Sequence, residues 1–65
     1  MYMVFYRTMD VFAAEEILHD NSIKTSIEPT PVQDKAYCGV CVEIELQDYE
    51  KAKDLLNGYE HTAIL

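Results

Sequence analysis

Hydrophobic positions follow a helical spacing in two stretches of the chain and strand-like patterns elsewhere. The opening run Met1–Tyr6 is apolar without a breaker, which is typical of a buried strand. Helical spacing then predicts a helix over Met9–Asp20, with Thr8 as its N-cap. The apolar face of this helix is formed by Val11, Ala14, Ile17 and Leu18. Phe12 lies outside that face, so it either folds over the edge of the sheet or meets a partner.

Apolar and polar residues alternate with a period of two in the middle of the chain. The segment Ile23–Glu28 alternates like an edge strand with one solvated face. A loop over Pro29–Tyr37 follows, and its two prolines restrict the backbone. Residues 40–46 alternate again and predict a half-buried strand. Its two sides are Val40, Val42, Ile44 and Leu46 on one and Cys41, Glu43 and Glu45 on the other.

The last third of the chain predicts a helix over Asp48–Asn57, capped by Asp48 and ended by Gly58, and a short strand over Thr62–Leu65. The order strand, helix, strand, strand, helix, strand is typical of one α+β domain, 1–65. It predicts a ferredoxin-like βαββαβ sandwich, in which a four-stranded antiparallel sheet of order 4-1-3-2 carries both helices on one face.

This topology brings distant segments to one edge of the sheet. The first strand ends there, and both the first helix and the third strand begin there. Cys38 is therefore expected near Arg7 and Thr8, with His61 entering from the far side. His19 is expected at the opposite edge.

Size and charge narrow the choice of partners. A chain of 65 residues buries only about 60% of its unfolded surface, so we expect a homo-oligomer that associates through the open face of the sheet. The net charge of -7 repels phosphate backbones and anionic lipids, which argues against nucleic acid and membrane surfaces as partners. The sequence has no export signal or apolar span, so we expect a cytoplasmic protein with reduced thiols.

Cys38 and Cys41 are the candidate chemical groups, and their spacing leaves several interpretations open. Three extended residues separate Cα atoms by about 10 Å, beyond the roughly 7 Å limit of a disulfide. A redox pair, with Cys41 as resolving thiol, therefore requires Gly39 to turn the chain back. A zinc site would need the cysteines with His19 and His61, which the topology separates, so no metal is expected.

Cys38 on its own can serve as a single reactive thiol. A helix N-terminus and a neighbouring cation both favour the thiolate, and the helix start at Thr8 and Arg7 would supply them. Alternatively, Cys38 is a small side chain that packs at the start of a strand and has no chemical role. The sequence shows no acid–base pair, phosphate loop or cofactor motif, which argues against an enzyme and predicts no cofactor. A small-ligand regulatory module of the same shape stays open.

One pattern in the sequence resembles that of a known family, and its specific part is the spacing from Pro29-Thr30-Pro31 to Cys38-Gly39. The pattern consists of Tyr2–Tyr6, Ala14–Leu18, Ile23, Glu28–Pro31 and the Cys-Gly pair at 38–39, which starts seven residues after the second proline. On these residues the chain resembles the selenium/sulfur carrier-like domain family. The resemblance implies a compact domain whose working cysteine, Cys38, holds sulfur or selenium as a persulfide or its selenium analogue. It also implies donor and acceptor proteins as partners, and it gives Cys41 no role.

Overall fold

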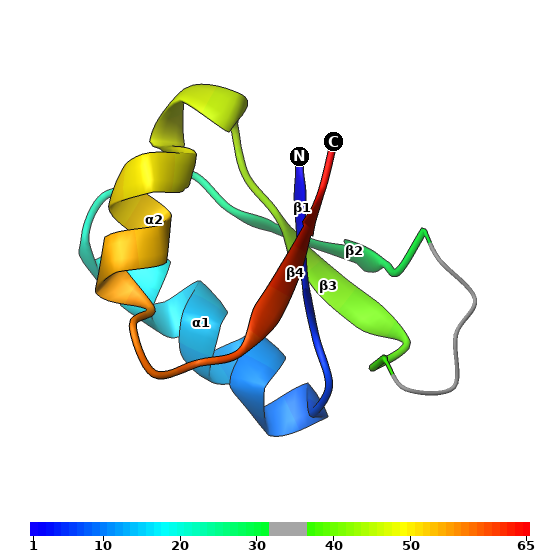
Figure 1. Cartoon of the computed structure of the whole chain (residues 1–65). Helices are drawn as coiled ribbons and strands as arrows, with labels where there is room; N and C mark the ends of the chain where they lie inside the picture. Colours follow the sequence, from blue (N-terminus) through cyan, green and yellow to red (C-terminus); the bar gives the residue numbers. More distant parts are fainter. Residues whose placement is uncertain (32–36) are drawn as a thin grey trace.

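The computed structural model describes residues 1–31 and 37–65, so most of the predicted loop Pro29–Tyr37 lies outside the described residues. The elements, shown in Figure 1, are β1 (Tyr2–Phe5), α1 (Thr8–Asp20), β2 (Ser26–Pro29), β3 (Val40–Glu43), a 3₁₀ turn η1 (Leu46–Asp48), α2 (Tyr49–Leu55) and β4 (His61–Ile64). No helix in this part of the chain is long and apolar enough to cross a bilayer.

The four strands form one antiparallel sheet of order β2-β3-β1-β4, which is the predicted order read from the other edge. Both helices lie on the same side of the sheet (Figure 1). The predicted ferredoxin-like α+β arrangement is therefore confirmed. The first and last strands pair along their whole length, from Tyr2 opposite Ile64 to Phe5 opposite His61, which brings the two ends of the described chain together.

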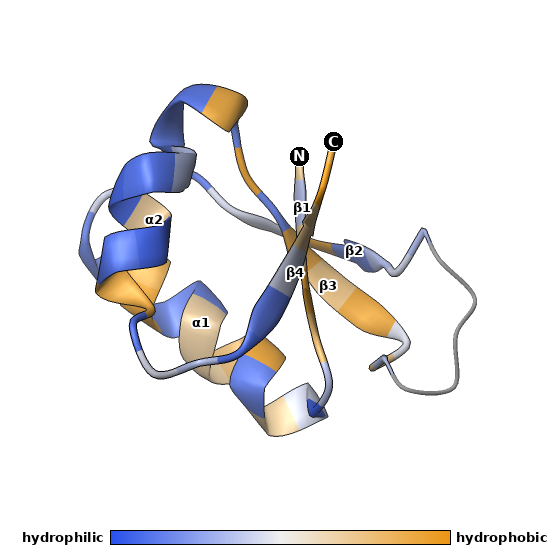
Figure 2. Cartoon of the chain, viewed as in Figure 1, coloured by the Kyte–Doolittle hydropathy of each residue, from blue (hydrophilic) through white to orange (hydrophobic). Residues whose placement is uncertain are grey.

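The core lies between the sheet and the helices. Figure 2 shows hydrophilic and hydrophobic positions alternating along both helices, whereas β3 is mostly hydrophobic. The buried core residues are Met3, Phe5, Val11, Ala14, Leu18, Ile23, Val42, Ile44, Ala52 and Leu56. Burial of these side chains is the main favourable term for so short a chain, at roughly 25 cal/mol per Å² of apolar surface.

The second strand begins later than the sequence predicts. Ile23 precedes it and is buried in the core. Ser22 adopts a positive φ of 62°, and the N–H of Ile23 donates to the carbonyl of Leu18 at 2.9 Å. This is a helix-ending motif in which the apolar residue after the turn packs back on the helix. Ile23 therefore belongs to the end of α1 and Ile27 to β2, so the alternating pattern covers two different elements.

The predicted cap of the first helix is wrong, whereas that of the second is confirmed in position. Arg7, and not Thr8, occupies the N-cap position of α1, and Thr8 is the first helical residue. Asp48 does precede α2, but its side chain makes no capping hydrogen bond. Gly58 has a positive φ of 103°, which glycine adopts readily, and it ends the turn after α2.

The strand predicted over 40–46 is shorter than expected, because the chain leaves the sheet after Glu43 and enters the 3₁₀ turn. Leu46 begins that turn and is 64% exposed, so its predicted inward position is wrong. Cys41 lies on the face opposite the helices, yet it is fully buried. The register of β1 with β3 places Val4 beside it, and Val4 is fully buried as well. The expected self-association through this face stays a prediction.

Candidate functional site

The end of β1, the start of α1 and the approach to β3 meet at one edge of the sheet, as the topology predicts. The backbone N–H of Cys38 donates to the carbonyl of Phe5 at 2.9 Å. This bond ties the residue before β3 to the last residue of β1. The Cys38 side chain is therefore held at the point where the chain turns into α1.

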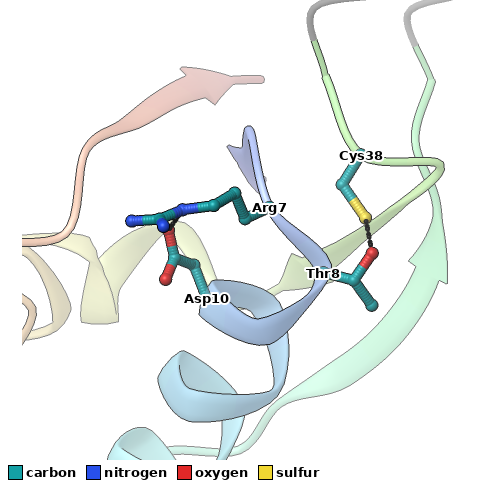
Figure 3. Close-up of polar contacts among 4 residues, drawn as sticks. All are labelled: Arg7, Thr8, Asp10 and Cys38. Carbon is teal, nitrogen blue, oxygen red and sulfur yellow. Dashed lines mark hydrogen bonds and ion pairs between the residues drawn. The ribbon is translucent and has the colours of Figure 1, made fainter.

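The sulfur of Cys38 contacts the first residue of the helix. Its Sγ atom lies 3.1 Å from Oγ1 of Thr8, and Figure 3 shows the two side chains pointing toward each other. Either atom can be the donor when the thiol is protonated, whereas a thiolate can only accept. Thr8 therefore provides a donor for the charged form of Cys38, a role that the sequence analysis missed by assigning its hydroxyl to a cap.

The Pro-Thr-Pro and Cys-Gly parts of the sequence pattern are joined by two hydrogen bonds. The Thr30 hydroxyl donates to the carbonyl of Cys38 at 2.6 Å, and the Thr30 N–H donates to the carbonyl of Gly39 at 3.0 Å. Thr30 has the only N–H between two prolines that have none. Its position in the motif was the sequence signal that could have identified it as the residue that fixes the backbone of Cys38.

Gly39 was expected to provide special loop geometry. Its φ is not positive, and a Cβ atom added there would meet nothing within 4 Å. The backbone at this position does not require a glycine. The missing side chain instead leaves open space beside Cys38.

Arg7 does not contact the Cys38 sulfur. Its Nε atom lies 3.6 Å from Oδ2 of Asp10, and Figure 3 shows both side chains directed away from Cys38. Any effect of Arg7 on a thiolate would act through space from an exposed position, where water and salt weaken it. The predicted stabilisation of the thiolate by Arg7 therefore stays a prediction, and Thr8 provides the direct contact.

Cys41 has a different environment from Cys38. Both cysteines are free thiols, Cys38 partly exposed and Cys41 fully buried. The Cys41 Sγ atom points to the carbonyl oxygen of Pro29 at 3.7 Å. Burial is the main cause that raises the pKa of the Cys41 thiol; Thr30 lowers it, and the carboxylates of Glu28 and Glu43 each raise it by a smaller amount. The neutral, unreactive form of Cys41 is therefore favoured.

Neither histidine forms a hydrogen bond with a thiol in the described residues. His61 contacts the hydroxyl of Tyr49 at 3.1 Å, and its ring centroid lies 5.9 Å from that of Phe5. His19 is exposed in the last turn of α1, far along the helix from Thr8. Among residues 1–31 and 37–65, no three histidine, cysteine, aspartate or glutamate side chains could together hold a metal ion.

We expect Thr8→Val to slow alkylation of Cys38 at neutral pH by about 3- to 10-fold. A hydrogen bond to a charged group contributes about 1.5–3 kcal/mol, and partial exposure reduces the effect here. The measurement is timed labelling with iodoacetamide followed by mass mapping. Thr8→Ser keeps the hydroxyl and is the matched control. Equal rates in the two variants would contradict a role for the Thr8 hydroxyl.

The fold and the site together define a small α+β domain that presents one accessible cysteine at the start of a helix. The chain belongs to the family described as "Putative Se/S carrier protein-like", whose model matches residues 1–64. Neither the curated proteins nor the solved structures compared with the chain give a match. Family membership therefore indicates a protein of selenium/sulfur carrier-like type.

Proposed function

We propose that this domain carries sulfur or selenium on Cys38, as a persulfide or its selenium analogue, between a donor and an acceptor protein. The observation that supports this most directly is the placement of the Cys38 sulfur, partly exposed and 3.1 Å from the Thr8 hydroxyl at the start of α1. The thiolate is the form that attacks sulfur, and the Thr8 hydroxyl can donate a hydrogen bond to it.

The loading step needs no oxidant. The Cys38 thiolate attacks the outer sulfur of a persulfide on the donor protein, and a new S–S bond forms as the bond within the donor persulfide breaks. The donor leaves as a thiolate, and Cys38 becomes the persulfide. Delivery to the acceptor is the same exchange with the roles reversed. Selenium would follow the same path, with one selenium atom in place of the transferred sulfur.

The environment of Cys38 suits a carrier better than an enzyme. In the described part of the chain, the polar side chain in contact with its sulfur is Thr8, a hydroxyl that does not act as a base near neutral pH. In the described residues, no hydrogen bond joins the acid–base candidates Asp10 and His61 to the Cys38 sulfur. We place the domain in the cytosol, where thiols stay reduced and persulfides can be passed between proteins.

The proposal predicts that Cys38, and not Cys41, takes up one sulfur or selenium atom. The test is incubation with a cysteine desulfurase and either cysteine or selenocysteine, which load the desulfurase with the outer sulfur or selenium atom to be transferred, followed by intact mass measurement. The wild type is expected to gain the mass of one sulfur or selenium atom, and a reducing agent should remove it. Cys41→Ser should be loaded like the wild type, because the Cys41 thiol that it removes is buried on the face of the sheet away from the helices. Cys38→Ser should not be loaded.

Three outcomes would replace this proposal. Loading of Cys38→Ser to the same extent would move the chemistry to Cys41 or away from cysteine. A disulfide between Cys38 and Cys41 that forms at a biological potential, without any loading, would favour the redox alternative. A small metabolite that raises the melting temperature, with both thiols inert, would favour the regulatory module.

A further inference from the structure

A cleft of about 570 Å³ opens at the same end of the sheet as Cys38, where β1 leads into α1 and the turn after α2 leads into β4. It is lined by Tyr6, Arg7, Asp10, Gly58, Tyr59 and Glu60. Ligand pockets typically enclose about 300–1,000 Å³, so the cleft can hold a side chain of another molecule. The proposed chemistry of Cys38 makes no use of it.

The charges in the cleft favour a cation. Two carboxylates, Asp10 and Glu60, face one cation, Arg7, in a chain whose net charge is -7. The Arg7 side chain is 81% exposed and stays 3.6 Å from Asp10, longer than a hydrogen bond. Exposed ion pairs of this kind contribute about 0–1 kcal/mol. The Asp10 carboxylate, only 22% exposed, therefore remains available to a second cation.

Two tyrosine rings complete the lining and suit the same ligand. Tyr6 follows β1 and Tyr59 follows α2, and both line the cleft. Guanidinium and ammonium groups bind the faces of such rings with about 0.5–1 kcal/mol at exposed sites. An arginine or lysine side chain would thus find carboxylate and aromatic partners in one place.

The cleft and the thiol lie on two sides of the same junction. Tyr6 lines the cleft, and its ring stacks on that of Tyr37 with centroids 5.3 Å apart; Tyr37 immediately precedes Cys38. Arg7 lines the cleft, and the next residue, Thr8, contacts the Cys38 sulfur. Figure 3 shows Arg7 and Asp10 on one side of the start of α1 and Cys38 on the other.

We propose that this cleft binds an arginine or lysine side chain of the protein that exchanges sulfur or selenium with Cys38. The partner would carry a basic residue beside its own reactive sulfur. The negative charge of the domain would speed the encounter, and the cleft would orient the partner over the thiol. This inference rests on the proposed carrier function for the identity of the partner, whereas binding of a cation in the cleft can be measured without it.

The test is an NMR titration of the uniformly ¹⁵N-labelled full chain with acetyl-Gly-Arg-Gly-amide, with acetyl-Gly-Gln-Gly-amide as the uncharged control. The arginine peptide should shift the backbone signals of Tyr6, Asp10 and Gly58 to Glu60, and the glutamine peptide should not. Shifts spread over the acidic surface, or shifts produced equally by both peptides, would overturn the proposal.

Three variants test the roles of individual charges. Asp10→Asn should weaken binding of the arginine peptide at least about threefold, since it removes the less exposed carboxylate. Glu16→Gln removes one negative charge from an exposed position of α1 outside the cleft, and it should have little effect. Arg7→Gln should strengthen binding, because it removes the competing cation. Equal weakening by Asp10→Asn and Glu16→Gln would show attraction to the net charge alone and would refute the site.

The acidic peptide acetyl-Gly-Glu-Gly-amide tests whether the cleft prefers an anion. If it binds in the cleft and Arg7→Gln abolishes that binding, the cleft is an anion site and the proposal is wrong. The titration tests the cleft and the loading experiment tests the carrier function, so each proposal can be refuted independently of the other. Cation binding without any loading of Cys38 would refute the carrier function, whereas loading without cation binding would refute the cleft as a docking site.

Discussion

Iodoacetamide is expected to label Cys38 at least about a hundred times faster than Cys41 in the native domain. Cys38 is partly exposed, whereas Cys41 is fully buried and its pKa is raised by that burial. Cys41 can react only when the sheet opens. A domain of 65 residues, at about 0.05–0.15 kcal/mol per residue, has a stability of roughly 3–10 kcal/mol, and 1.4 kcal/mol corresponds to about a tenfold change in population.

Timed alkylation followed by mass mapping measures both rates in one sample. Labelling in concentrated urea is the control, because unfolding should remove most of the difference. The single-cysteine variants Cys38→Ser and Cys41→Ser exclude any influence of one thiol on the other. Faster labelling of Cys41, or equally slow labelling of both thiols, would contradict the site.

The strand order and the meeting of Cys38 with Thr8 could be predicted because they follow from topology. Once six elements of the right period are placed in order, a split βαβ arrangement determines which ends share an edge. Neither prediction depended on the conformation of a particular side chain. This explains why the edge was predicted correctly although several element boundaries were not.

The roles of Thr8, Thr30 and Arg7 depend on local competition, which sequence patterns do not resolve. A threonine before a helix can cap it or begin it, and here the cap position goes to Arg7. Arg7 had Asp10 as a possible partner three residues further on, which is a favourable helical spacing, and it contacts that residue and not the thiolate. The Pro-Thr-Pro motif marks Thr30 in the sequence, but its hydrogen bond to the Cys38 carbonyl depends on the register of β2 with β3, which the motif does not give.

Cys41 illustrates a different limit. The alternation of β3 correctly placed it on the face away from the helices, and that face was expected to be solvated. Val4 beside it is fully buried too, so the sheet is covered at this point despite lying outside the main core. Period alone gives the face on which a side chain lies and does not give its exposure.

The contrast between two phenylalanines tests how closely the site depends on the core. Phe5→Ala is expected to cost about 3–5 kcal/mol, because its ring is fully buried in the core. That loss is a large part of the stability of so small a domain, and the melting temperature should fall by more than about 15 °C. Thermal unfolding followed by circular dichroism measures it. Because a destabilised domain opens more often and exposes the buried thiol, we expect the labelling rates of Cys38 and Cys41 to converge in this variant.

Phe12→Ala is the matched control, with the same atoms removed from a side chain that is 56% exposed on α1. Substitutions at such positions usually change the free energy of unfolding by less than about 0.5 kcal/mol. The variant should therefore unfold like the wild type and keep the large difference between its two thiols. If Phe12→Ala proves as destabilising as Phe5→Ala, the ring folds over the sheet edge in solution and contributes to the core. The surface of α1 beside Thr8 would then be less apolar than its sequence indicates, and a partner approaching Cys38 from that side would find no aromatic contact there.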